Sequence, residues 1–368
     1  MGEKLGVGIV GLTPGRSWSA FAHVPALQAL SDTFSFNAVA NSSAESAKRA
    51  AAELGSLQAY GSVGEMATAD DIDIVSVTVK VPHHLALARQ AIDAGKHIYC
   101  EWPLGNGLAE ARELADLAKN RSIVAVAGLQ ATAAPAIRYA ADLIAEGYVG
   151  DVISSTLVGD GGSWGPETSN AYDYILDRAN GATMLTIPLG HTLAGVVEML
   201  GPIADVLATM TTRFPLVKVV ETGEMKPMTA PDQIIVSATL ESGAPLAIHY
   251  RGGVSRSTGL LWEILGTKGD LRITGSQGHA QMVDLALSGA QGEGSAVAPL
   301  DIPERYLDNL PSAAVPGNVA RMYADMALDI RSGTQRAPSF EDAVGIHQII
   351  DAIEASAASG VRVRPDSR

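Results

Sequence analysis

The sequence has 368 residues, of which 47% are hydrophobic and 18% charged, and this length is more natural for two domains than for one core. The formal net charge of −14, without any run of lysine or arginine, argues against the basic face of a nucleic-acid-binding protein. The one cysteine, Cys100, excludes an intramolecular disulfide framework and a multi-cysteine metal site, as expected in a reducing compartment.

The beginning of the chain enters an apolar strand almost at once, without the charged n-region and cleavage site of a secretory leader. No apolar run reaches the ~18 residues that a membrane span needs. We therefore expect a soluble cytoplasmic protein that binds neither a membrane nor nucleic acid.

The first 130 residues alternate short apolar runs with helical patterns, which is typical of βαβ units. Strands are expected at 5–10, 34–40, 72–79, 97–100 and 123–128. Helices are expected at 23–30, 44–54, 84–94 and 108–118. Continuous apolar runs such as Leu5–Val10 are typical of parallel strands that are covered on both faces. Residues 1–130 are therefore predicted to form a doubly wound Rossmann domain.

The pattern changes over residues 131–368, which we assign to a second domain. A helix at 136–146, a strand at 153–159 and a proline-containing helical segment at 182–200 come first. Strands at 234–240, 246–250, 260–265 and 271–274 then follow one another without helices, which indicates an antiparallel or mixed sheet. Residues 276–318 are expected to be rich in loops. Helices at 319–331 and 340–357 close the chain and can pack back on the first domain. The predicted fold class is α/β, a Rossmann half followed by an α/β half with a large mixed sheet.

The turn after the first strand carries two glycines, Gly11 and Gly15, but lacks the middle glycine of a G-x-G-x-x-G loop. In such loops the backbone N–H groups and the following helix N-terminus hold a pyrophosphate. Thr13 occupies the middle position, where its hydroxyl can donate to phosphate, and Pro14 removes one N–H donor. A working loop, a decayed loop and an ordinary turn are all open, although the location at the first strand–helix turn favours cofactor binding. The candidate cofactor residues here are Gly11, Thr13, Pro14, Gly15, Arg16, Ser17 and Trp18.

The second strand ends at Asn41 and Ser42, where a carboxylate would select NAD and a nearby arginine would favour NADP. Neither is present in the immediate turn, so the choice between NAD and NADP stays open. The alternative for Ser42 or Ser43 is the N-cap of the next helix.

Two further clusters follow strands at their carboxyl ends, where open α/β sheets bind ligands. Lys80 can act as acid or base beside a nicotinamide, or can be a solvated lysine. Glu101 can lie by the nicotinamide ribose, and Trp102 can be a wall against a ring or a core aromatic. His83 or His84 is expected to cap a helix or contact the cofactor, and without a third ligand no metal site is expected. The candidate cofactor residues are Thr78, Val79, Lys80, Pro82, His83, His84, Glu101, Trp102 and Pro103.

A histidine, His191, lies on an apolar helical segment of the second half. It can serve as acid or base or orient a sugar hydroxyl, although a lone histidine on an apolar helix is more often structural. Asp173 and Tyr174 lie just upstream and can line the same cleft.

Four segments resemble, in this order, segments of the Gfo/Idh/MocA oxidoreductase family: GKHIYCEWPLG, APAIRYAADLIAEGYVGDV, WEILGTKGDLRI and IRSGTQRAPSFEDAVGIHQIIDAIEASAASG. Within the family, GLTPGRSW, SVTVKVPHH, EWPL, GLQ, GDGGSWG and LGHT are most similar to the branch that contains the fungal galactose-regulon repressor. The resemblance covers essentially the whole chain. It implies a Rossmann half that binds NAD(P) and a mixed-sheet half whose open face commonly forms a dimer interface. It adds Gln130 to the cofactor residues. Together with the clusters above, the substrate-binding candidates are Trp102, Trp164, Asp173, Tyr174 and His191.

The chain departs from the family pattern at two positions. Family dehydrogenases carry lysine where this chain has Trp102, and usually aspartate where it has Ile187, so only His191 of the usual set remains. The leading hypothesis is an NAD(P)-dependent oxidoreductase of a sugar, polyol or related hydroxy compound, in which Lys80, His191 or Tyr174 handles the proton. A cofactor-gated regulator without turnover and a redox-neutral, NAD-dependent glycoside cleavage are the alternatives. We also expect a homodimer or higher homo-oligomer through the second-domain sheet.

Overall fold

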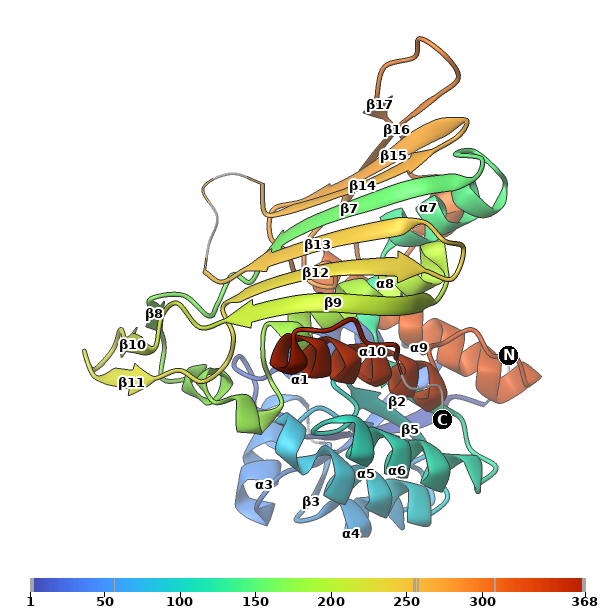
Figure 1. Ribbon diagram of the computed structural model, residues 1–368. Coiled ribbons are helices and arrows are strands. Elements are labelled where there is room, and N and C mark those ends of the chain that lie inside the picture. The colour runs from blue at the N-terminus through green and yellow to red at the C-terminus, as the bar shows by residue number, and fades with distance from the viewer. Residues whose placement is uncertain (1–2, 56, 254–255, 257, 308, 366–368) are drawn as a thin grey trace. The chain divides into compact units, whose positions relative to one another are not determined.

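The computed structural model describes residues 3–365 except 56, 254–255, 257 and 308, and it divides into two compact units (Figure 1). The first unit comprises residues 1–130 and 309–344, and the second comprises 131–308 and 345–368. The segment 309–344, which the sequence analysis placed in the second domain, therefore belongs to the first unit. We describe each unit by itself.

The first unit is built on a parallel six-stranded sheet in the order β3-β2-β1-β4-β5-β6. The strands are β1 (Leu5–Val10), β2 (Phe34–Ala40), β3 (Gln58–Tyr60), β4 (Ile74–Val77), β5 (His97–Glu101) and β6 (Ala125–Gly128). The strand order reverses between β1 and β4, which is the switch point where doubly wound sheets bind ligands. The predicted Rossmann fold is confirmed.

Short helices connect these strands, and a long helix from the end of the chain joins them. The connecting helices are α1 (Trp18–Phe21), α2 (His23–Ala29), α3 (Ala44–Glu53), α4 (Val63–Ala67), α5 (His84–Asp93) and α6 (Leu108–Lys119). Ser43, not Ser42, is the N-cap of α3, since its hydroxyl accepts from the N–H of Ser46 at 3.2 Å. The returning helix α9 (Ala314–Ser332) packs against α2 and contributes Tyr323 to the core, and α10 (Phe340–Ser359) begins in this unit.

The second unit is built on an eight-stranded mixed sheet in the order β17-β16-β15-β14-β7-β13-β12-β9 (Figure 1). The strands are β7 (Val152–Asp160), β9 (Ile203–Thr211), β12 (Gln233–Leu240), β13 (Pro245–Arg251), β14 (Leu260–Gly266), β15 (Gly269–Gly275), β16 (Ala286–Gln291) and β17 (Ala298–Pro299). Neighbouring strands are antiparallel except β7 and β13, which are parallel. The predicted mixed sheet is confirmed.

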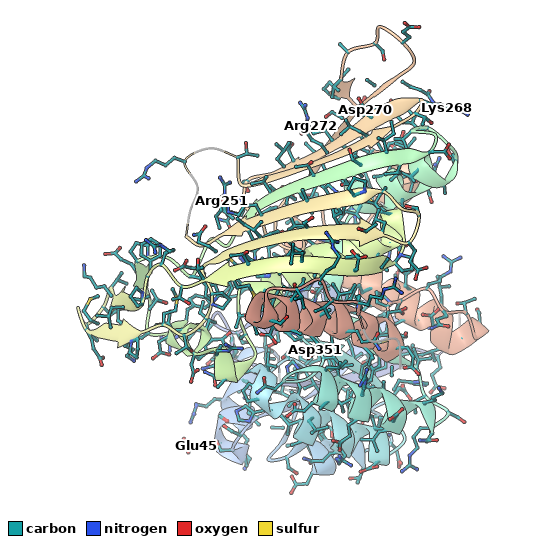
Figure 2. All side chains as sticks on the ribbon, viewed as in Figure 1. Glu45, Arg251, Lys268, Asp270, Arg272 and Asp351 are labelled. Atoms are coloured by element: carbon teal, nitrogen blue, oxygen red, sulfur yellow. The ribbon has the colours of Figure 1, made fainter. Side chains whose placement is uncertain are left out.

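One face of this sheet is covered by α7 (Pro135–Ala145) and α8 (Gly190–Leu200). A Cβ added at Gly195 of α8 would lie 3.3 Å from Ile137 of α7 and 3.5 Å from Trp262 of β14, so these elements are in close contact. Along the β14–β15 hairpin, Arg272 pairs with Glu263 at 2.8 Å, and Lys268 occupies the turn (Figure 2).

Several strands differ from the sequence-based expectation. β9 was missed, and β16 and β17 lie where only loops were expected. β9 is an edge strand and β16 lies one strand from the other edge, so each alternates buried and exposed residues and lacks a continuous apolar run. A further small sheet of β8 (Glu167–Thr168), β10 (Leu216–Val219) and β11 (Met225–Pro227) was also missed, because such short strands carry little periodicity.

The segment Arg178–Leu200 is long and apolar enough to cross a membrane, with a mean hydropathy of 1.2, which the sequence analysis did not anticipate. It contains the π-helical turn Leu185–Leu189 around Pro188 and then α8. In the structure, 72% of its most apolar window is buried, and buried core helices pass the same length and composition test.

Candidate functional site

The loop after β1 is braced by side chains rather than by a middle glycine. Asn41, at the end of β2, makes two hydrogen bonds to the backbone of Leu12. Its Oδ1 accepts from the Leu12 N–H at 2.9 Å, and its Nδ2 donates to the Leu12 carbonyl at 2.9 Å. The Ser17 hydroxyl accepts from the Thr13 N–H at 2.9 Å. Gly11 adopts φ +89°, and a Cβ there would lie 2.6 Å from Val79. The loop is thus held on both sides in one conformation.

The residues that this loop presents are those predicted to meet a dinucleotide. Thr13, Gly15 and Arg16 are exposed, Pro14, Ser17 and Trp18 are half-buried, and nothing lies within 4 Å of a Cβ placed on Gly15. Among the described residues, the buried indole Nε1 of Trp18 has no hydrogen-bond partner. An unpaired buried donor and an open glycine in the same loop fit an arriving phosphate or carbonyl oxygen. The helix that follows, α1, has only four residues, so the expected helix-dipole contribution is small.

The segment after β4 is fixed by a buried histidine. The Thr78 hydroxyl donates to the Val10 carbonyl at 2.7 Å, which ties β4 to β1. His84 is buried, and its Nδ1 lies 2.8 Å from the Pro103 carbonyl and its Nε2 2.9 Å from the Val79 carbonyl. Burial lowers the pKa of His84, against the opposing effect of these carbonyls. His84 therefore links the segment that follows β4 with the segment that follows β5. Lys80, Pro82 and His83 are exposed.

Glu101 ends β5 and lies in a buried polar network. Its Oε1 is 2.8 Å from Nε2 of His23, and Nε2 of Gln130 donates to both carboxylate oxygens at 2.8 Å. The Gln130 Oε1 is buried and has no donor among the described residues, so a ligand hydroxyl can complete it. Trp102 is only 5% exposed, which makes it a core aromatic in the first unit. Burial raises the pKa of the Cys100 thiol well above its usual range, as an inert core cysteine requires.

The second unit holds a cluster around two buried histidines. His191 lies near the start of α8, and burial together with the neighbouring His279 lowers its pKa to about 3. His279 donates from Nε2 to the Gly161 carbonyl at 2.6 Å, and its ring stacks on Trp164 with a centroid distance of 6.3 Å. Both imidazoles are therefore neutral at physiological pH. Sequence reasoning missed His279 because it lies in a segment expected to be loop.

Trp164 has a backbone conformation that is unusual for a bulky side chain, with φ +54°. Its indole Nε1 donates to the Ile175 carbonyl at 3.1 Å, which fixes the ring against His279. Positive φ at a non-glycine residue costs free energy and clusters at ligand sites. Trp164 is 3% exposed, and its substrate-binding role stays a prediction.

Asp173 and Tyr174 lie in a short helical turn of the second unit. The Asp173 carboxylate pairs with Lys226 at 2.7 Å, so its charge is already compensated. Burial raises the pKa of Tyr174, which is half-buried and stays protonated at neutral pH. Among the described residues, no three His, Cys, Asp or Glu side chains gather as metal ligands.

Comparison with known proteins assigns each half of the chain. Residues 5–128 match the GFO_IDH_MocA family, described as an oxidoreductase family with an NAD-binding Rossmann fold, and residues 135–275 match the C-terminal domain of Gal80p. The chain belongs to the Gfo/Idh/MocA oxidoreductase family. Its second domain is of the Gal80 type.

Relatives in this family include regulators and dehydrogenases. The galactose/lactose metabolism regulatory protein of Kluyveromyces lactis is 31% identical over 301 residues, which cover 76% of this chain and 66% of that protein. The dehydrogenase aclE of Aspergillus oryzae is 28% identical over 372 residues, or 98% of each chain. Levoglucosan dehydrogenase of Pseudarthrobacter phenanthrenivorans is 25% identical over 78% of this chain and 79% of its own.

Solved structures show the same fold. The transcriptional regulator Gal80p of K. lactis superposes with a TM-score of 0.88 at 27% identity and covers 99% of this chain and 92% of its own. Levoglucosan dehydrogenase in complex with NADH and levoglucosan superposes with a TM-score of 0.87 at 21% identity, over 100% of both chains. Similarity alone therefore does not separate the two kinds of function.

Proposed function

We propose that this protein is an NAD(P)-dependent oxidoreductase of a sugar, polyol or related hydroxy compound. The observation that carries the proposal is the braced loop after β1, which leaves a buried donor on Trp18 and open space at Gly15. A protein that had lost its cofactor would not need Asn41 and Ser17 to hold an exposed loop in one conformation. The NADH that accompanies a structural neighbour of this fold supports a nicotinamide cofactor.

The first unit would hold the dinucleotide through Thr13, Arg16 and Trp18, with Glu101 and Gln130 toward the nicotinamide ribose. When bound, the nicotinamide supplies hydride chemistry at its C4 atom. No carboxylate stands at Asn41 to reject a 2′-phosphate, and its amide is used on Leu12, so we propose that either NAD or NADP is accepted.

The second unit would bind the uncharged substrate. The neutral His191 can accept a hydrogen bond from a carbinol hydroxyl, and its low pKa makes it an orienting group rather than a strong resting base. The protonated hydroxyl of Tyr174 can donate to a carbonyl oxygen, which suits the reducing direction. The buried Trp164 indole would hold the His279 ring in place behind the substrate.

The experiment is a two-step measurement on the purified protein. NADH and NADPH binding is followed by fluorescence, and the absorbance of the reduced nicotinamide is then followed across a panel of sugars, polyols and their carbonyl counterparts. Binding with turnover of at least one compound is expected. Tight cofactor binding without any absorbance change across the panel would contradict the proposal that the protein is an oxidoreductase.

A cofactor-gated regulator is the second candidate, because one observation favours it. The position of the family lysine is held by Trp102, which is buried, and Ile187 replaces the family aspartate, so the usual proton-handling groups are absent. This reading predicts a protein partner whose capture from the native host changes when NAD(P) is added. Recovery of the protein alone, with and without cofactor, would count against it.

We further propose that the protein is cytoplasmic and forms a homodimer through the open face of the second-unit sheet. Cross-strand register aligns Thr209, Ile235, His249, Val158 and Leu261 across five strands, and Ile235 is 51% exposed. Thr209 and Ile235 are exposed and the other three are half-buried, and an uncharged, partly exposed row of this kind suits a sheet that another surface covers. Light scattering should give twice the chain mass, and Ile235→Lys should shift it toward the monomer; a monomeric wild type would rule out the dimer.

A further inference from the structure

Glu101 is the end of a longer chain of buried polar groups within the first unit. His23 of α2 joins Glu101 through Nε2 and reaches the Tyr323 hydroxyl of α9 through Nδ1, at 2.8 Å in each case. The Tyr323 hydroxyl lies 2.7 Å from the hydroxyl of Ser76 in β4. The chain therefore connects the carboxyl end of β5 with a helix more than two hundred residues downstream.

The donors and acceptors in this chain match one by one. A carboxylate only accepts, so Nε2 of His23 carries the proton toward Glu101. Burial raises the pKa of Tyr323, which therefore stays a hydroxyl and can donate to Nδ1 of His23 while it accepts from Ser76. Every step is satisfied in the order Ser76, Tyr323, His23, Glu101. We name these four residues the Glu101 relay.

The surrounding packing leaves the relay little freedom. His23, Ser76 and Tyr323 have no exposed surface, and Glu101 is 8% exposed. The Tyr323 ring stacks on Tyr99 with a centroid distance of 5.0 Å, so its hydroxyl cannot swing away. On the other side, a Cβ on Gly128 would lie 3.1 Å from the Glu101 carboxyl carbon and 3.0 Å from Gln130 Nε2.

Burying this many polar groups away from water costs more folding free energy than an apolar core would. Such a network is therefore expected where the groups hold a functional side chain in position. Glu101 stands at the strand end where this fold binds ligands, and one of its oxygens is already committed to His23. We propose that His23 and Tyr323 are positioning residues that hold the Glu101 carboxylate for the cofactor ribose, so that α9 sets the cofactor affinity of the first unit. This inference rests on the proposed cofactor binding.

The test compares two tyrosine-to-phenylalanine variants of the full chain. Tyr323→Phe removes one relay hydroxyl, and Tyr250→Phe removes an equally buried hydroxyl of the second unit, which contacts Thr192 at 2.6 Å and the Gly278 carbonyl at 2.9 Å. Both should be less stable to urea by similar amounts. Only Tyr323→Phe should weaken NADH binding, by about tenfold, because a buried partner of His23 is lost.

A second pair of variants supplies a rescue. His23→Leu removes the contact with Glu101 and should weaken NADH binding by about a hundredfold, since the carboxylate then keeps Gln130 but loses the partner that fixes its Oε1. His23→Gln retains an N–H donor of similar reach and should recover a large part of that loss. Equal NADH affinity in wild type and Tyr323→Phe, or equal losses in His23→Leu and His23→Gln, would overturn the proposal.

Side-chain ¹⁵N spectra of the histidines separate this proposal from the proposed function. The His23 resonances should move in both Glu101→Gln and Tyr323→Phe and stay in place in Tyr250→Phe. If the wild type binds neither NADH nor NADPH, the proposed function and the affinity part of this inference fail together. Unmoved His23 resonances in Tyr323→Phe, with cofactor still bound, would overturn the relay alone.

Discussion

The edge of the first unit and the histidine cluster of the second unit bury polar groups in opposite ways. In the first unit, Glu101 keeps its place through charge-assisted hydrogen bonds to His23 and Gln130. In the second unit, burial instead makes His191 and His279 neutral, and the cluster is completed by the stacked Trp164. The first arrangement suits a ligand that carries fixed charge and hydroxyls, and the second suits an uncharged ring. Because the two sites use different chemistry, the proposed cofactor site of the first unit can be retained even where the usual catalytic residues of the family are replaced.

The largest expected effect is on the first unit. Glu101→Ala leaves the buried donors of His23 and Gln130 without their shared acceptor and should lower the free energy of unfolding by about 3 kcal/mol. Urea denaturation of the full chain measures this. His191→Ala is the matched change in the second unit and should cost less, because it removes no acceptor that two buried donors share; equal losses would remove the proposed difference between the regions.

Trp164 offers a direct test of strain in the second unit. Trp164→Ala should lower stability by about 3 kcal/mol, because the buried indole is lost. Trp164→Gly loses the same indole but tolerates φ +54°, so it should be more stable than the alanine variant by about 1 kcal/mol. The two urea midpoints decide this, and an alanine variant as stable as the glycine variant would show that the backbone conformation costs nothing.

A smaller effect is expected at the cofactor loop. Asn41→Ala removes both hydrogen bonds to Leu12 and should cost about 1–2 kcal/mol of stability. It should also weaken the binding of NADH and of NADPH to the same degree, since the change disturbs the loop conformation and removes no contact with the ribose. Titration calorimetry with both cofactors provides the measurement. A loss of affinity for only one of them would show that Asn41 contacts the ribose instead.

The pH dependence of stability sharpens the description of the histidine cluster. The pKa of His191 is about 3 in the folded protein against about 6.5 in the unfolded chain. Between these values the unfolded chain binds a proton that the folded protein does not, so stability falls as the pH falls, by up to about 1.4 kcal/mol per pH unit. His191→Gln should flatten this slope between pH 6 and 4 in urea unfolding, and an unchanged slope would assign the effect to other groups.

Strands with continuous apolar runs were predictable from the sequence. β1 has the predicted bounds, because a strand covered on both faces shows its burial in composition alone; β2, which is only partly buried and contains Ser35 and Asn37, also has the predicted bounds. β9 was not found, because one of its faces is open and its burial alternates irregularly. The cofactor-loop residues could be predicted from their place after β1. The hydrogen bonds between Asn41 and Leu12 could not be predicted, because they join two strand ends that only the sheet brings together.

By itself, the sequence determined the Rossmann order of elements, the mixed sheet and the family, because hydrophobic periodicity and family motifs are local properties of the chain. The tertiary structure decided which polar groups are paired. His23 and Tyr323 lie three hundred residues apart, and His279 comes from a segment expected to be loop. Hydrogen bonds and burial depend on distances in space, and the residues that form the Glu101 relay and the histidine cluster become neighbours only when β-strands and helices pack.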